Sequence, residues 1–476
     1  MSRQQFDAAV IGSGPNGLCA AIALAQAGRS VVVFEARDTP GGGVRSTEDW
    51  TQPGFVHDIC SAIHPMAAGS PFLNTLNLQE HGLEWVQPPI PMAHPFDDGP
   101  PALLHRSLEQ TGETLGIDAD TYPAWMGPFV SRWDDLAKDA LAPLGWPNDP
   151  ILMARFGWLG FRSGWSLAKS AFQDPRGQAF SAGLTAHSVL PLEVRPSAAI
   201  GLMLGIAGHA VGWPLPKGGA ASLTKALVSK LQAEGGELRC GHAIESLDEL
   251  PVRGPLLFDT SPRAMADIAG DALPASFSQK LHRFRHGPGI FKMDFALDGP
   301  IPWKDPECSQ AGTVHLGSTL DEIAASERAA NNGVYTNRPF VILAQQSLFD
   351  STRAPEGKQV CWAYCHVPSG SKQDRSKAIQ AQIERFAPGF RDRVLETHCW
   401  NAQDFSQYNP NYIGGDVNGG VPDLGQLFTR PTARAVPYST PNPRLFLCSA
   451  STPPGGGVHG MCGAHAAQAA LDAWPE

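Results

Sequence analysis

The sequence predicts an α/β fold in which one domain is assembled from separated pieces of the chain. Near the amino end, an apolar run typical of a buried strand is followed by a glycine-rich turn, a helical pattern and a second strand. A strand, a glycine-rich turn and a helical pattern also close the chain, from about residue 440. Another helix and two further strands lie between about 213 and 262. This alternation is typical of a parallel sheet whose faces are covered by helices.

The first element is the short, mostly apolar run from Phe6 to Ile11, which predicts a buried strand. Three glycines, Gly12, Gly14 and Gly17, follow it at G-x-G-x-x-G spacing. They allow a tight turn and let the backbone approach a pyrophosphate closely. From Leu18 onward the apolar residues recur at helical spacing, so the turn opens a helix whose unpaired amides attract phosphate.

The second strand, Val31 to Phe34, ends at an acidic residue. Glu35 lies 18 residues past the third glycine, where a carboxylate accepts hydrogen bonds from a ribose diol. The run Gly41 to Arg45 follows, which predicts a second flexible loop with a fixed cation that closes over the same pyrophosphate. A simple nicotinamide dehydrogenase does not need that loop, so the pattern favours FAD.

With these residues the sequence resembles the FAD-dependent oxidoreductases related to phytoene desaturase, within the amine-oxidase-like flavoproteins. The resemblance covers nearly the whole chain and includes three further blocks: WPLPKGGAASLTKALVSKLQAEGGELRCGHAIESL from Trp213, NPNYIGGDVNGG from Asn409 and PRLFLCSASTPPGGGVHGMCGAHAAQAAL from Pro443. It implies a Rossmann-type FAD-binding domain interleaved with a mixed α+β substrate domain. The FAD-binding domain would comprise 1–65, 213–262 and 440–476, and the substrate domain 66–212 and 263–439.

The motifs and the resemblance together give a set of expected FAD-binding residues. These are Gly12, Ser13, Gly14, Pro15, Asn16, Gly17, Glu35, Ala36, Gly42, Gly43, Val44, Arg45, Ala243, Ile244, Ser449, Ala450, Val458, His459, Gly460 and Met461. The resemblance implies that Val458 to Met461 lie beside the isoalloxazine and that Ser449 and Ala450 lie beside the ribityl-phosphate. A helix that begins near Met461 would stabilise the negative charge of reduced flavin.

Three residues are candidates for catalysis. His459 stands where many relatives have proline, and two interpretations stay open: it hydrogen-bonds substrate or moves protons, or it only packs or hydrogen-bonds a backbone carbonyl. His57, in the run with Asp58 that follows the first cofactor unit, is the second candidate, although hydrogen bonding to backbone is the more common role. Lys292 resembles a lysine near flavin N5 in amine-oxidase-like relatives, but alternation places it with Asp294 on a solvated edge.

Composition excludes several other function classes. The net charge of −10 with no basic run argues against nucleic acid as a partner. No metal-binding pattern, no G-x-S-x-G and no H-E-x-x-H occur. No second dinucleotide pattern is present, so we expect electrons to leave to oxygen or a quinone rather than to a nicotinamide docked in its own domain.

The expected location is cytoplasmic, with contact to a membrane surface left open. The nine cysteines are an odd number without a C-x-x-C pair, which favours reduced thiols. The first strand follows MSRQQ at once, and no apolar run approaches the roughly 18 residues of a membrane span. The stretch 151–171 mixes aromatic and basic residues, which is consistent with an interfacial helix, with a wall of the substrate cavity or with ordinary core.

The sequence therefore predicts an FAD-dependent dehydrogenase or desaturase that passes hydride from an apolar, polyene-like or isoprenoid-like substrate to flavin N5. A flavin-dependent amine oxidase or double-bond isomerase is the first alternative, with Trp362 and Tyr364 as candidate walls for an amine. A flavoprotein without turnover that acts through a partner is an alternative of another class.

Overall fold

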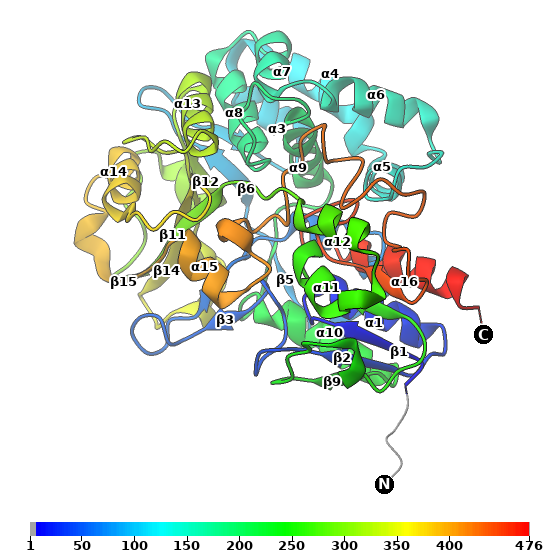
Figure 1. Cartoon of the computed structure of the whole chain (residues 1–476). Helices are drawn as coiled ribbons and strands as arrows, with labels where there is room; N and C mark the ends of the chain where they lie inside the picture. The colour runs from blue at the N-terminus through cyan, green and yellow to red at the C-terminus, as the bar shows by residue number, and fades with distance from the viewer. Residues whose placement is uncertain (1–5, 476) are drawn as a thin grey trace.

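A five-stranded parallel sheet occupies one end of the molecule (Figure 1). The computed structural model describes residues 6–475. The strand order is β16-β10-β1-β2-β9, with bounds β1 (Ala8–Ile11), β2 (Val31–Phe34), β9 (Glu237–Arg239), β10 (Leu256–Phe258) and β16 (Leu445–Leu447). Three separated pieces of the chain supply these strands, while the domain boundaries given above remain a prediction. The α/β fold class with a Rossmann-like sheet and a second, mixed sheet is confirmed.

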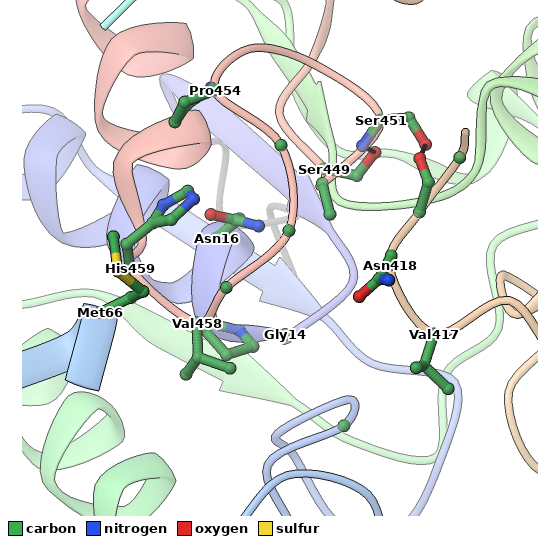
Figure 2. A pocket seen from close by; sticks show the side chains of 18 of the residues that line it. Gly14, Asn16, Met66, Val417, Asn418, Ser449, Ser451, Pro454, Val458 and His459 are labelled. Carbon is green, nitrogen blue, oxygen red and sulfur yellow. Dashed lines mark hydrogen bonds between the residues drawn. The ribbon is translucent and has the colours of Figure 1, made fainter. Parts of the chain in front are cut away.

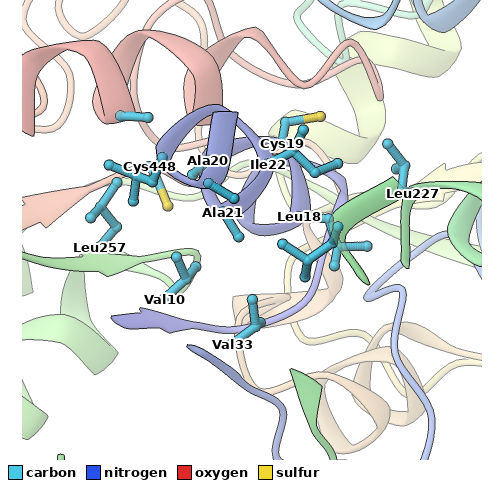
Figure 3. Packing of buried hydrophobic residues seen from close by; sticks show 14 of the residues in the cluster. Val10, Leu18, Cys19, Ala20, Ala21, Ile22, Val33, Leu227, Leu257 and Cys448 are labelled. Atoms are coloured by element: carbon cyan, nitrogen blue, oxygen red, sulfur yellow. The ribbon is translucent and has the colours of Figure 1, made fainter. Parts of the chain in front are cut away.

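Helices cover both faces of this sheet because successive strand residues point to opposite sides. On one face Val10, Val33 and Leu257 pack against Leu18 and Leu227 (Figure 3). The helices on this face are α1 (Pro15–Gln26), α10 (Ala221–Ala233) and α16 (Met461–Ala473). The other face packs against α11 (Pro262–Ala269) and α12 (Ala275–His282).

A seven-stranded mixed sheet forms the second layer of strands. Its order is β15-β11-β14-β13-β12-β6-β7, and β6 and β12 are its parallel neighbours. The bounds are β6 (Ile90–His94), β7 (Ala102–Leu104), β11 (Gly289–Leu297), β12 (Ala311–Leu316), β13 (Val341–Ala344), β14 (Gln359–Val367) and β15 (Val394–Trp400). One face, with Phe291 and Phe295, packs against Ile379 and Ile383 of α14 (Ser376–Phe386).

The expectation that Lys292 and Asp294 lie on a solvated edge is wrong. Alternation is correct, because both side chains share the face opposite Phe291. However, β11 is an interior strand between β14 and β15, and Trp50 lies over Lys292. Lys292 and Asp294 are therefore only 1% and 2% exposed. A polar face of a strand need not meet water when other segments cover it.

Most of the remaining helices gather at the end of the molecule opposite the five-stranded sheet (Figure 1). The remaining helices are α2 (Pro65–Ala68), α3 (Leu108–Glu113), α4 (Thr121–Val130), α5 (Trp133–Ala140), α6 (Pro150–Gly160), α7 (Gly164–Ala171), α8 (Pro175–Ala186), α9 (Ala198–Ala210), α13 (Leu320–Asn331) and α15 (Ala402–Tyr408). Two small strand pairs add β3 (Ser46–Thr47) with β4 (His57–Asp58) and β5 (Trp85–Val86) with β8 (Leu215–Pro216). Across residues 6–475, no helix has both the length and the apolar character needed to span a bilayer.

The stretch 151–171 forms two helices rather than one. Helix α6 ends at Gly160, and Ser163 caps α7 by accepting a hydrogen bond from the amide of Ser166. A serine at a cap satisfies an amide that the first turn leaves unpaired, so the break is built into the sequence.

Candidate active site

A large cavity runs between the two sheets, and residues of both line it. Its volume is about 1150 Å³. Most of the expected cofactor-binding residues line it: Gly12, Ser13, Gly14, Pro15, Asn16, Glu35, Ala36, Gly42, Gly43, Val44, Arg45, Ala243, Ile244, Ser449, Ala450, Val458 and His459. Gly17, Gly460 and Met461 do not line it. Of the three catalytic candidates, His459 lines the cavity, and Lys292 and His57 lie outside its lining.

The glycine loop between β1 and α1 is packed so closely that side chains are excluded. Gly12 has φ of +99°, and a Cβ there would lie 2.6 Å from the carbonyl oxygen of Asp259. A Cβ on Gly17 would lie 2.2 Å from the carbonyl oxygen of Gly12. A Cβ on Gly42 would lie 3.1 Å from Cα of Gly14, so the second loop touches the first. The backbone therefore shapes this end of the cavity, as a pyrophosphate requires.

Glu35 is fixed at the end of β2 by four contacts. Its Oε2 accepts hydrogen bonds from the amide (3.1 Å) and the hydroxyl (2.5 Å) of Ser13, and its Oε1 accepts one from the amide of Arg37 (2.9 Å). Arg45 Nη2 lies 3.3 Å from Oε1. Arg45 also donates to the carbonyl oxygens of Thr39 and Pro40. The Glu35 carboxylate is thus held rigidly at the cavity wall, and the Arg45 guanidinium is paired with it.

The loop 449–459 forms the opposite wall and carries backbone strain. Figure 2 shows it passing beside Gly14 and Asn16, with Asn418 on its other side. A Cβ on Gly456 would lie 2.9 Å from the carbonyl oxygen of Asn418, so this segment also excludes side chains. Val458, which lines the cavity, has φ of +57°, a conformation that β-branched residues rarely adopt. Strained backbone persists only where surrounding contacts hold it, and it is found mainly at ligand-binding and active sites.

His459 is buried and turned toward the start of α16. Its Nδ1 accepts a hydrogen bond of 3.0 Å from the amide of Met461, and its Nε2 has no protein partner. Its carbonyl oxygen accepts from the hydroxyl of Ser70. Burial lowers the pKa of His459 to about 4, so the imidazole is neutral near neutral pH. An accepting Nδ1 leaves the proton on Nε2.

Lys292 and His57 meet behind the cavity wall in a buried ionic cluster. Lys292 Nζ pairs with Asp294, and it lies 5.0 Å from the ring centre of Trp50 and 5.7 Å from that of Trp362. His57 Nδ1 lies 3.6 Å from Asp294, and its Nε2 is 2.7 Å from the hydroxyl of Thr51. The hydrogen bond of His57 is thus to the side chain of Thr51 and not to a backbone group, while its Nδ1 has no hydrogen-bond partner among the described residues. The cluster supports the wall, since Lys292 packs against Trp362, which lines the cavity, while Lys292, Asp294 and His57 do not line it.

The far half of the cavity is mainly apolar. Its walls are Met203, Trp213, Ile290, Ile342, Trp362 and Tyr364. His187 adds a polar group, and its Nε2 lies 3.0 Å from Nε2 of His315, which is fully buried on β12. Burial lowers the pKa of His187 to about 3 and that of nearby His94 to about 4. These histidines are neutral, and sequence spacing gave no sign of the cluster because its members come from different elements.

The cavity also extends to an exposed apolar rim. Leu144 and Trp146, in the segment between α5 and α6, are 72% and 91% exposed and line the cavity. Phe161 stacks on Phe428 with ring centres 5.4 Å apart, and both also line it. Large apolar side chains in contact with solvent mark a binding or entry surface more often than an ordinary one.

The residues present fit a bound FAD. The long cavity combines a glycine cradle that a Cβ would fill, a fixed carboxylate at the end of β2 and the amino end of α1. These features match the needs of ribose and pyrophosphate. The Oδ1 of Asn16 is buried without a protein partner beside the cradle, so a polar ligand would satisfy it.

Comparison with known proteins agrees with this fit. Residues 10–75 match the model of the NAD(P)-binding Rossmann-like domain. The chain is 25% identical to pyridine nucleotide-disulfide oxidoreductase domain-containing protein 2 of Rattus norvegicus, over 98% of this chain and 93% of that protein. It is 25% identical to 4,4'-diapolycopen-4-al dehydrogenase of Metabacillus indicus, over 94% of this chain and 93% of that protein.

The fold is also that of a solved oxidase. Putrescine oxidase with bound putrescine superposes with a TM-score of 0.63 at 17% identity, over 99% of both chains. Sequence relatives, fold and cofactor cradle agree. The chain is an FAD-dependent oxidoreductase that is similar in sequence to carotenoid dehydrogenases and desaturases and has the fold of putrescine oxidase.

Proposed function

We propose that this protein dehydrogenates an apolar, polyene-like or isoprenoid-like substrate. The observation that carries the proposal is the far half of the cavity, where Met203, Trp213, Ile290 and Ile342 give apolar walls. The carboxylates that line the cavity within residues 6–475 are Glu35 and Asp259 at the nucleotide cradle and Asp139 of α5, which accepts hydrogen bonds from the amides of Asn148 and Asp149. An apolar chain gains free energy from such walls, whereas a cation would lose its hydration without a partner. When bound, FAD supplies the acceptor for the substrate's hydride at its N5 atom.

The protein's own residues would act mainly by positioning. The aromatic side chains of Trp213 and Trp362 fix the plane of a conjugated chain and exclude water. His187 lies at the cavity wall as a neutral hydrogen-bonding group; because burial lowers its pKa to about 3, it is a poor general base, and the proton released when a C=C bond forms would pass to solvent. We propose that His459, which lines the cavity, positions the cofactor. Lys292 and His57 do not line the cavity, so we propose that they support its wall.

An amine oxidase is the second candidate, and one observation favours it. The rings of Trp362 and Tyr364 lie 5.3 Å apart at an interplanar angle of 40° and both line the cavity. Two aromatic faces at a cavity wall can attract a cationic amine. A double-bond isomerase would use the same apolar walls as the dehydrogenase and differ only in returning the hydride.

We also propose that electrons leave to oxygen or a quinone, because the sequence has no second dinucleotide pattern to hold a nicotinamide.

A further proposal is that the substrate enters from a membrane surface. The exposed rim formed by Leu144, Trp146 and Phe161 opens into the cavity. Aromatic and aliphatic side chains of this kind insert at the boundary between headgroups and acyl chains. A water-insoluble substrate would then pass from lipid to cavity without crossing water.

The test is anaerobic mixing of the purified, flavin-loaded protein with three probes. A micellar polyene such as phytoene should bleach the flavin absorbance, while putrescine and NADPH should leave it unchanged. Bleaching by putrescine instead would select the amine oxidase. A protein that holds flavin which no probe bleaches would favour the role without turnover, and a protein without flavin absorbance would contradict the dehydrogenase, the amine oxidase and the isomerase.

The membrane proposal has its own measurement. Sedimentation with phosphatidylcholine vesicles should retain the protein, and the variant Leu144→Ser/Trp146→Ser should lose most of that binding. Val334→Ser, which removes another exposed apolar side chain far along the chain, is the control and should bind as before. Equal sedimentation of all variants would contradict the proposal.

A further inference from the structure

A carboxyl group lies inside the cradle where the pyrophosphate is expected. Asp259 follows β10 directly and lines the cavity. Its Oδ2 accepts a hydrogen bond of 2.9 Å from the amide of Gly17, in the first turn of α1. A Cβ on Gly14 would lie 2.4 Å from the same oxygen. Asp259 therefore occupies the amino end of α1, the position that attracts anions in folds of this type.

Within residues 6–475, no cation packs against this carboxyl group. The charged group that faces it is Glu35, at the end of β2. Three thiols also face it: Cys19 of α1, Cys448 after β16 and Cys462 of α16. Burial raises the pKa of all three thiols, that of Cys462 to about 11, so they remain neutral. Arg45, the cation nearest Glu35, pairs with that residue and with backbone carbonyls.

The surroundings accordingly disfavour the ionised form of Asp259. Burial, with a smaller contribution from Glu35, raises the pKa of Asp259 to about 7, although the amides of Gly17 and Gly14 oppose the shift. A bound pyrophosphate would bring two more negative charges to the same helix end. Like charges this close cannot all be ionised at small cost in a site that excludes water.

We propose that Asp259 is a cofactor-binding residue that acts in its protonated form, so that binding of FAD takes up one proton. The neutral carboxyl group keeps the contact with Gly17 through one oxygen and can donate a hydrogen bond toward the pyrophosphate through the other. The inference rests on the assignment of the pyrophosphate to this loop. It adds to that assignment a residue that the glycine motif does not contain and a dependence on pH.

The affinity of the protein for FAD should therefore fall as the pH rises. Above the pKa of the free protein, each pH unit should raise the dissociation constant of FAD about tenfold, because one proton must be bound with the cofactor. Between pH 7 and pH 8.5 the expected loss is on the order of 15-fold, because Asp259 is still half protonated at pH 7. Riboflavin, which has no pyrophosphate, should bind with no such dependence. If Asp259 were only an ionised cap of α1, FAD affinity would be flat over this range.

The experiment is a fluorescence titration of the flavin-free protein with FAD and with riboflavin from pH 6 to pH 9. Calorimetry in two buffers of different ionisation enthalpy counts the protons taken up, and one per FAD is expected at pH 8.5. Asp259→Asn should abolish both the slope and the proton uptake, and at pH 8.5 it should bind FAD at least tenfold more tightly than wild type.

Glu35→Gln is the matched control in the same site. It should weaken FAD binding while keeping the slope, with its midpoint at lower pH, since one charge that opposes ionisation of Asp259 is gone. A flat wild-type profile, or an Asp259→Asn profile that keeps the slope, would overturn the inference. A protein that binds no FAD at any pH would overturn the cofactor assignment itself, which is a different outcome from either of these.

Discussion

The two halves of the cavity are built by different means. The nucleotide half is made by backbone: two glycine loops, the first turn of α1 and a strand end come within a few ångströms of one another. The substrate half is made by side chains such as Trp213, Ile342 and Trp362, which come from distant parts of the chain. The first half recognises groups that FAD always carries, and the second recognises what varies between substrates.

The two halves of the cavity also differ in what supports them. In the nucleotide half, close packing against backbone carbonyl oxygens excludes side chains at Gly12 and Gly17. The substrate half depends on buried polar groups behind its wall, including the pair Lys292–Asp294 and the histidines His187, His315 and His94. Buried charge must be paired to be tolerated. Substitutions in the two halves should therefore fail in different ways.

The largest expected effect is on the nucleotide half. Gly17→Val should abolish retention of FAD, by at least 100-fold in affinity, because its Cβ would lie 2.2 Å from the carbonyl oxygen of Gly12. Flavin absorbance per polypeptide after gel filtration measures this. Gly28→Ala is the control: that residue also has positive φ, +83°, but no atom lies within 4 Å of the added Cβ. It should cost about 1 kcal/mol of stability and leave flavin content unchanged.

The same contrast explains what the sequence could predict. The glycine spacing and Glu35 define the nucleotide half because the backbone path itself demands those residues, and they are contiguous in the chain. The environment of Lys292 was not predictable from alternation, since Trp50 and two flanking strands bury that face. Asp259 could be placed at the end of a strand, but its contact with Gly17 needs the folded sheet. Side chains that meet through tertiary packing leave no local pattern.

The next effect is on stability and comes from the wall of the substrate half. Lys292→Met should destabilise the protein by about 3–5 kcal/mol, because it leaves the Asp294 carboxylate buried without its partner. Urea denaturation measures the loss. The double variant Lys292→Met/Asp294→Leu should recover most of it, since no unpaired charge remains. Lys358→Met, which breaks a solvent-exposed pair with Asp298, should cost less than about 1 kcal/mol. Equal losses at the two lysines would contradict a buried, supporting role.

The smallest expected effect is a loss of stability at acid pH. Burial holds the pKa of His94 at about 4, against about 6.5 in an unfolded chain. Between these values the unfolded chain binds a proton that the folded protein does not, so this contribution to stability is complete above pH 6.5 and is lost as the pH falls toward 4. At pH 5 the loss from His94 should be about 2 kcal/mol.

His94→Gln tests this because the amide can still donate to the carbonyl oxygen of Ser318, which the Nε2 of His94 contacts at 3.0 Å. The free energy of unfolding from urea titrations at pH 7 and pH 5 should fall less in this variant than in wild type, by about 2 kcal/mol. His282→Gln reports the effect of losing an imidazole at the surface. The same acid dependence in wild type and His94→Gln would mean that burial of His94 as a neutral imidazole does not limit stability in acid.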